Sequence, residues 1–471
     1  MGMGRRTRVR QDELWVATSA LPRAGAHPFY DRVNEILNDS DFDVFVEDLC
    51  RRFYADKVGR PSLAPGIYFR LLMIGYFEGI DSERGIAWRL ADSLALRRFA
   101  GIALTEGTPD HSTISRNRRL IDLETHQDVF TWMLQVLAKH KLLDGKTIGV
   151  DASTLEANAA LRSIIRRDTG ERYDEFLTRL ATESGIETPT REDLARLDKT
   201  RKNKGSNDDW QNPHDPDAKI TKMKDGRTHL AHKAEHSVDM TTGAIVAVTL
   251  QPAHRGDTTS LGETLKQTDA NLVAVMTDAA AAEQLNEQVL SELVADKGYH
   301  SNAVLTDCVE KEIRSYVSEP DRGRRSWTGN SDEEREAKSA ARDAVYGNRR
   351  RIKGDRGKRL MKRRGELLER SFAHCYDTGG MRRTHLRGHE NILKRLLIHD
   401  AGFNLSLVMR KWIGIGTARG LQGRLARLLS AILCPMRSIG AAIRCRWSIA
   451  MEFRRPLPKF IADRSTVRYA A

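Results

Sequence analysis

Two short apolar segments, far apart in the chain, each end in an aspartate, and they constrain the fold more than any other feature. One segment covers residues 292–295 and is followed by Asp296 and Gly298; the other covers residues 147–150 and is followed by Asp151. A short apolar run that stops at a carboxylate or a turn residue is typical of a buried parallel strand. Ligands of open α/β sheets bind at the carboxyl ends of such strands. The pattern therefore predicts a site built from Asp151 and Asp296.

Length and charge narrow the class of protein. A chain of 471 residues is long enough for two or three domains, and its formal charge of +13 predicts a polyanionic partner, above all nucleic acid. The five cysteines are scattered without a CxxC pair, which indicates free thiols in a reducing compartment. The N-terminal residues have no apolar core of a secretory signal, and no run of about 18 uncharged apolar residues occurs. We therefore expect a cytoplasmic protein that does not contact membranes.

A basic arm at residues 1–25 precedes a region, 26–145, whose apolar spacing predicts a helical DNA-binding domain. Residues 108–119 begin with capping residues and continue with short polar side chains and three arginines. Recognition helices of helix-turn-helix proteins present such residues to base edges and phosphates. We expect DNA contacts from Ser115, Arg116, Arg118 and Arg119. The alternative is a solvated basic helix face.

The region between the two aspartates predicts an insertion and a hairpin. Residues 155–228 are polar and charged, whereas residues alternate in character over 232–239, and after a turn at 241–243 a returning strand follows at 244–250. The hairpin is expected to extend the strand of Asp151. The three histidines His229, His232 and His236 do not have the spacing of a zinc site, and no cysteine is near them.

A second insertion is expected at residues 321–364, where the charge is strongly positive. A solvated face is the usual explanation of a charge run, but the density and single sign here favour contact with phosphates. Lys297, beside Asp296, is a further candidate. The residues expected to contact DNA in this part of the chain are Lys297, Arg349, Arg350, Arg351, Arg363 and Arg364. Residues 411–471 are expected to form a helical basic C-terminal tail.

Paired carboxylates on a basic chain suggest metal-dependent phosphodiester chemistry. Mg²⁺ or Mn²⁺ takes hard oxygen ligands, and two such ions about 4 Å apart can activate a nucleophile and stabilise a leaving oxygen. The site needs a third acid from a later helix, and Glu369 and Glu390 are the candidates. Either aspartate could instead cap a strand-to-loop turn, and Glu390 could be a surface residue paired with Lys394 four residues on.

Three blocks of sequence resemble the bacterial insertion-sequence DDE transposases. They are residues 148–153 around Asp151, residues 294–299 with the pattern D-x-G-Y around Asp296, and residues 363–372 around Glu369. The resemblance covers roughly residues 25–410. The family usually has a lysine seven residues beyond the glutamate, where this chain has Tyr376, and Arg364 is one residue off the common Arg-to-Glu spacing. Glu390 is therefore kept as the alternative third acid.

The resemblance implies an α/β catalytic domain at residues 146–410 with an RNase H-like mixed sheet flanked by helices. It implies that Asp151, Asp296 and Glu369 are the catalytic residues and bind two Mg²⁺ (or Mn²⁺) ions. It also implies a bacterial transposase that binds the terminal inverted repeats of its element and joins them to target DNA. The expected partner is double-stranded DNA in the nucleoid, on which the chain is expected to act as a homodimer. Two alternatives remain open: an inactive or domesticated DNA-binding protein, and an RNase H-like nuclease without strand transfer.

Overall fold

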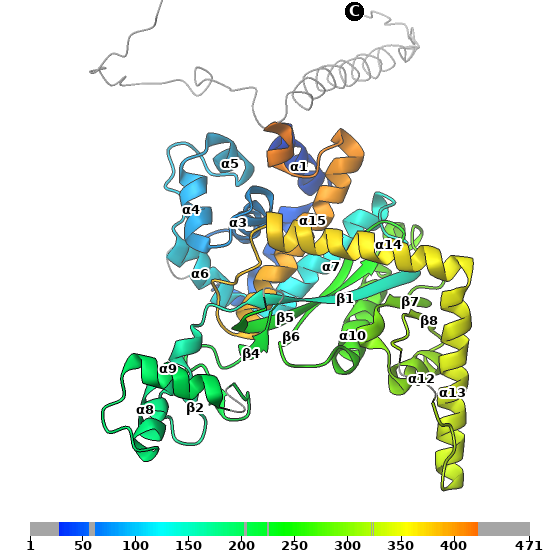
Figure 1. Ribbon diagram of the computed structural model, residues 1–471. Coiled ribbons are helices and arrows are strands. Elements are labelled where there is room, and N and C mark those ends of the chain that lie inside the picture. The colour runs from blue at the N-terminus through cyan, green and yellow to red at the C-terminus, as the bar shows by residue number, and fades with distance from the viewer. Residues whose placement is uncertain are drawn as a thin grey trace, which may run out of the picture. The chain divides into compact units, whose positions relative to one another are not determined.

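The computed structural model describes residues 28–55, 62–201, 205–223, 226–321, 323 and 325–422 (Figure 1). The expected basic arm and most of the expected C-terminal tail lie outside these ranges. No helix among the described residues is long and apolar enough to cross a membrane. Cys50, Cys308 and Cys375 are buried free thiols, as the scattered cysteines predicted.

The N-terminal part of the described chain is helical, as its apolar spacing predicted. Ser82, Ser93, Asp110 and Asp122 each cap a helix by accepting a hydrogen bond from a backbone N–H three residues on. The helices are α1 (Pro28–Asp39), α2 (Phe42–Cys50), α3 (Pro65–Glu78), α4 (Glu83–Ala91), α5 (Leu94–Phe99), α6 (His111–Leu120) and α7 (Leu123–Lys139), with a 3-10 turn η2 (Arg51–Phe53) after α2.

A mixed sheet follows the helices. Its order is β4-β5-β1-β7-β8, and β6 also pairs with β5. β7 runs parallel to both β1 and β8, whereas β5 runs antiparallel to β1, β4 and β6. The predicted hairpin is thus β5 and β6, and it extends β1 as expected. The strands are β1 (Thr147–Glu156), β4 (Lys219–Lys222), β5 (Thr228–Asp239), β6 (Ile245–Pro252), β7 (Glu292–Ala295) and β8 (Arg314–Val317).

Helices cover both faces of this sheet. Glu235 on β5 accepts hydrogen bonds from α10 (Asp257–Val275), whereas the next residue, His236, contacts Ser371 on α14 (Asp355–Phe372). Successive residues of a strand point to opposite faces, so α10 and α14 lie on opposite sides of the sheet. The short helix α11 (Ala279–Ala282) precedes β7, and a 3-10 turn η4 (Lys297–Tyr299) and α12 (Asn302–Glu310) connect β7 to β8. Helix α13 (Asp332–Lys353) follows β8 and leads to α14.

The long helix α15 (His389–Ile413) joins the helical region to the sheet. Nearly all of its residues from 394 to 409 are buried, which is typical of a helix surrounded by protein. It packs against α3, α7 and β6. Arg395 donates to the carbonyl oxygen of Leu72 in α3 at 2.7 Å, and Asn404 contacts the backbone of Ile245 in β6.

The polar segment between β1 and β5 is folded. It contains η3 (Leu161–Ser163), β2 (Ile165–Arg166), α8 (Tyr173–Glu183), α9 (Arg191–Thr200) and β3 (Trp210–Gln211), and Figure 1 shows it as a group of elements beside the sheet. Its own small core is formed by Trp210, Phe176, Leu177 and Ile164 among others. The second expected insertion, 321–364, is largely helical and forms α13 and the first half of α14.

Candidate active site

The structure brings Asp151 and Asp296 side by side. In the parallel pairing of β1 with β7, Val150 lies opposite Ala295, and the two aspartates come next on their strands. One nitrogen of Arg364 on α14, Nη2, lies 2.7 Å from Oδ2 of Asp151 and 3.9 Å from Oδ2 of Asp296. The distance between the two oxygens therefore cannot exceed the sum of these two distances. The carboxylates therefore face a common space, as the sequence predicted.

The electrostatic state of Asp151 is unusual for a carboxyl. Burial raises its pKa to about 6, although the positive charge of Arg364 and a hydrogen bond from the N–H of Ala152 lower it. The negative charges of Asp296 and Asp257 raise it further. The arginine therefore compensates only part of the cost of holding this carboxylate ionised.

The D-x-G-Y block after β7 can be explained residue by residue. Asp296 accepts a hydrogen bond from the N–H of Gly298 at 2.7 Å and so caps the turn η4. A Cβ at Gly298 would lie 2.5 Å from Oδ2 of Asp257, so only glycine leaves room for that carboxylate. Tyr299 is fully buried, and its hydroxyl donates to Glu235 on β5 at 2.9 Å. The motif thus fixes the loop that presents Asp296.

Sequence reasoning missed the place of Asp257. This residue begins α10. Its carboxylate lies against Gly298, close to Asp296, and its Oδ1 is 2.6 Å from Nζ of Lys233 on β5. Lys233 also lies 3.5 Å from the buried Glu235. No local signal could have placed Asp257 here, because the approach depends on how α10 packs on the sheet.

Glu369 is not joined to the aspartate pair in this structure. It lies on α14, one residue beyond Leu368, which packs against Gly149 of β1. The side chain of Glu369 is exposed, and within the described part of the chain no group of three potential metal ligands includes it. Its role as the third acid stays a prediction. The alternative, Glu390, is exposed and lies 2.6 Å from Nζ of Lys394, which is the surface pairing weighed for it above.

Tyr376, which stands where the family usually has lysine, belongs to the core. Its side chain is fully buried in a π-helical turn after α14, and its hydroxyl lies 2.5 Å from Nε2 of His236. The other ring nitrogen of His236 contacts Ser371 at 3.1 Å, and Asp400 on α15 lies 3.4 Å away. A lysine could not occupy this space without burying its charge. Because His236 lies opposite Asp151 in the β-ladder, this cluster ties the end of α14 to the strand of the first aspartate.

The residues predicted to contact DNA in the helical region divide into two groups. Arg116 and Arg119 are exposed on α6, and Ser115 is half-buried. Arg118 is buried and contacts Glu83, Ser115 and Asn391, so the structure uses it to join α6 to α4 and α15. Helix α6 thus carries exposed arginines on one face and a buried arginine that packs against neighbouring helices.

The basic residues around the sheet divide in the same way. Lys297, Arg350 and Arg363 are exposed. Arg349 forms two hydrogen bonds with Glu319, and Arg351 contacts the backbone and hydroxyl oxygens of Ser315. Arg364 faces the aspartate pair, as described above. Density of charge in the sequence could not separate these two classes, because the distinction depends on tertiary contacts.

The aspartate pair suits a hard divalent cation. Carboxylate oxygens are the ligands that Mg²⁺ and Mn²⁺ prefer, and the positively charged guanidinium of Arg364 already contacts both carboxylates. Within the described ranges, no three histidine, cysteine, aspartate or glutamate side chains are yet gathered as a metal-binding group. The fold thus brings two carboxylates together, and their binding of a metal ion stays a prediction.

Comparison with known proteins identifies two domain families. A family model described as "Transposase domain (DUF772)" matches residues 19–120, and one described as "Transposase DDE domain" matches residues 197–401. The second match implies an RNase H-like fold, the fold class predicted for the mixed sheet and its flanking helices. No curated protein and no solved structure matched the chain.

Proposed function

Because the chain belongs to the insertion-sequence DDE transposases, we propose that it binds the terminal inverted repeats of its own element, cuts DNA there and joins the ends to target DNA. The observation that supports this most directly is the adjacency of Asp151 and Asp296 at the ends of two parallel strands, in contact with the same arginine. Two carboxylates held in place can bind the metal ions that cleavage of a phosphodiester requires.

The proposed roles follow from the chemistry of the side chains. Asp151 and Asp296 would hold divalent ions, with Glu369 as the third acid once α14 or its side chain adjusts. Bound divalent ions would lower the cost of charge on the attacking and leaving oxygens. Arg364 lies beside the carboxylates, and Lys297 is an exposed residue that follows Asp296 in the chain; both would contact the phosphate being cut.

The reaction needs no external energy source. A water oxygen attacks the scissile phosphorus, the bond from phosphorus to O3′ breaks, and the leaving O3′ takes a proton to become a 3′-hydroxyl. That hydroxyl then attacks a phosphodiester of target DNA, so one P–O bond replaces another. Two ends must be joined to one target, and we therefore propose that two copies of the chain act together.

The test is cleavage of DNA that contains the ends of the element, with Mg²⁺ or Mn²⁺, by the wild-type protein and by Asp296→Asn. Loss of a metal ligand costs several kcal/mol of transition-state stabilisation, which is a fall in rate of about 100-fold or more. Asp278→Asn is the matched control, because Asp278 caps α11 and asparagine caps helices equally well. Equal cleavage by wild type and Asp296→Asn would refute the mechanism.

Analysis of the joined products separates the remaining alternatives. Cleavage without joining would indicate a nuclease, and DNA binding without metal-dependent cleavage would indicate an inactive DNA-binding protein. The separation of Glu369 from the aspartate pair makes this second outcome worth measuring directly.

A further inference from the structure

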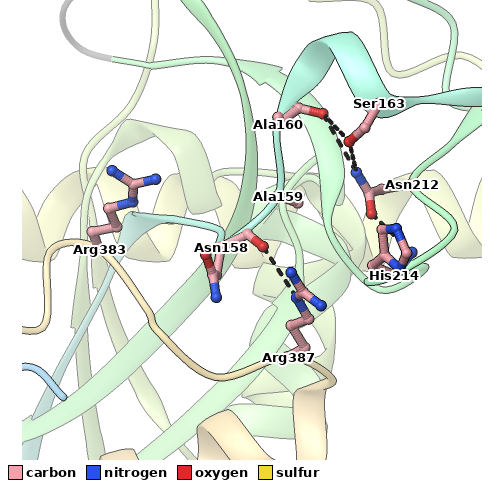
Figure 2. Close-up of a pocket in the computed structure, with 8 residues that line it drawn as sticks. All are labelled: Asn158, Ala159, Ala160, Ser163, Asn212, His214, Arg383 and Arg387. Carbon is pink, nitrogen blue, oxygen red and sulfur yellow. Dashed lines mark hydrogen bonds between the residues drawn. The ribbon is translucent and has the colours of Figure 1, made fainter. Parts of the chain in front are cut away.

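We propose that a cleft at the root of the first insertion binds the phosphate backbone of the DNA strand that passes over Asp151. This inference rests on the proposed function and adds to it a DNA-binding site outside the aspartate pair and outside all the basic residues singled out from the sequence. The cleft has a volume of about 270 Å³ (Figure 2). It is lined by Asn158, Ala159, Ala160, Ser163, Asn212, His214, Arg383 and Arg387.

One wall of the cleft is fixed by Asn212. This side chain is fully buried, and its Nδ2 donates to the carbonyl oxygen of Ala160 at 3.4 Å and to Oγ of Ser163 at 3.0 Å. Its Oδ1 accepts hydrogen bonds from the backbone of His214 and Asp215 at 2.9 and 3.1 Å. All these bonds lie within the insertion, so the wall exists before any ligand binds.

The opposite side of the cleft presents two guanidinium groups. Arg387 donates through Nε to the carbonyl oxygen of Asn158 at 3.3 Å, which orients the group and leaves its two terminal nitrogens for a ligand. Arg383 has a side chain that is 58% exposed and lies 3.9 Å from Glu156, too far for a hydrogen bond. Figure 2 shows the two groups on either side of Asn158. Glu156 lies beside Arg383, and Asp215 and Asp217 accept hydrogen bonds from the backbone N–H groups of Gly388 and His389, next to Arg387. The two guanidinium groups are the part of the cleft suited to phosphate.

The cleft is connected to the aspartate pair by β1. Beyond the end of β7, the backbone of residues 382–384 pairs with β1. The backbone N–H of Glu156 donates to the carbonyl oxygen of Arg382 at 2.9 Å, and the backbone N–H of Thr384 donates to the carbonyl oxygen of Glu156 at 2.8 Å. Arg382 also reaches Oγ of Ser153 at 2.8 Å, on the same face of β1 as Asp151. Arginines therefore follow β1 from Asp151 to the cleft.

The spacing fits a DNA strand. A strand rises about 3.3 Å per residue, so Glu156 lies about 17 Å along β1 from Asp151. B-form DNA rises 3.4 Å per nucleotide of one strand, so the cleft would meet the backbone about five nucleotides from the phosphate over Asp151. A backbone contact at this distance would position the strand without reading its sequence.

The experiment measures how the affinity of the full-length protein for DNA depends on salt, with EDTA present to prevent cleavage. The probes are a fluorescent mixed-sequence duplex and its single strand. Each lost phosphate contact reduces the slope of log affinity against log salt by about 0.9 for duplex and about 0.7 for single-stranded DNA. We expect Arg383→Ala/Arg387→Ala to reduce the slope by about 1.8 and about 1.4, whereas Arg196→Ala, an exposed arginine on α9, leaves it unchanged.

Two further variants guard against an effect of folding. His214 is exposed, so His214→Glu places a negative charge in the cleft without disturbing the core, and we expect weaker binding of both probes. Arg383→Lys/Arg387→Lys keeps the charge and should retain most of the slope. A wild-type slope in both the alanine pair and His214→Glu would overturn the cleft proposal. The proposed function would still stand if Asp296→Asn abolished cleavage, and it would fail together with the cleft if the wild-type protein bound neither probe.

Discussion

Nη2 of Arg364 lies 2.7 Å from Oδ2 of Asp151, and the same nitrogen is 3.9 Å from Asp296. Arg364 stands on α14, five residues before Glu369, so the helix expected to supply the third acid already supplies a positive charge to the first two. A metal ion at the aspartates would have to share them with this guanidinium or displace it. The position of α14 and the occupancy of the site are therefore expected to be linked.

Divalent-ion binding should depend on pH through Asp151. Burial raises the pKa of this carboxyl to about 6, so protons compete with the metal below that pH. Mn²⁺ affinity, measured by titration calorimetry, should fall as the pH decreases from 7 to 5. Arg364 lowers the pKa of Asp151, so Arg364→Ala should move the midpoint of this loss to higher pH. A midpoint that stays in place or moves to lower pH would contradict the assignment.

The third acid can be identified by comparing three amide substitutions. Glu369→Gln should reduce cleavage by about 100-fold or more if Glu369 is a metal ligand. Glu390→Gln should leave cleavage within a few-fold of wild type, because Glu390 is an exposed partner of Lys394. Asp257→Asn tests the acid that lies closest to Gly298. Loss of cleavage in Asp257→Asn with normal cleavage in Glu369→Gln would transfer the role to Asp257.

Tyr376 should matter for stability rather than for chemistry. Tyr376→Phe leaves Nε2 of the buried His236 without this partner, which costs about 1–3 kcal/mol in the free energy of unfolding. Tyr376→Lys should cost more, because it buries an ammonium group. Chemical denaturation measures both, with the exposed Tyr346→Phe as a control expected within about 0.5 kcal/mol of wild type. If Tyr376→Lys were as stable as the wild type, position 376 would not be buried as the structure shows it.

The arginines of α6 should separate into binding and folding residues. Arg116→Ala and Arg119→Ala remove exposed charges and should weaken DNA binding while the melting temperature is unchanged. Arg118→Ala leaves Glu83, whose side chain is 13% exposed, without its partner and should cost about 3 kcal/mol of stability. Fluorescence anisotropy and thermal melting distinguish the two effects. Normal DNA affinity in an Arg116→Ala/Arg119→Ala double variant would remove α6 from the DNA interface.

The elements that could be predicted from the sequence are those with a local signal. An apolar run that stops at a carboxylate placed β1 and β7, and alternation, a turn and a second apolar run placed the hairpin of β5 and β6. The neighbours of the site could not be predicted, because they come together only through tertiary packing. Asp257 reaches Gly298 from the start of α10, and Arg118 is buried by contact with α4 and α15. Composition alone also gave no sign that the first insertion has its own core around Trp210.

Helix α15 has a practical consequence for engineering. It packs against both α3 and α7 and against β6, so the N-terminal helices and the sheet share one helix in their cores. A chimera that exchanges residues 26–145 for those of another transposase would set foreign side chains against Arg395, His399 and Phe403, which now contact α3. Grafts of this region should therefore recover solubility only when the donor's own version of α15 is transplanted with it.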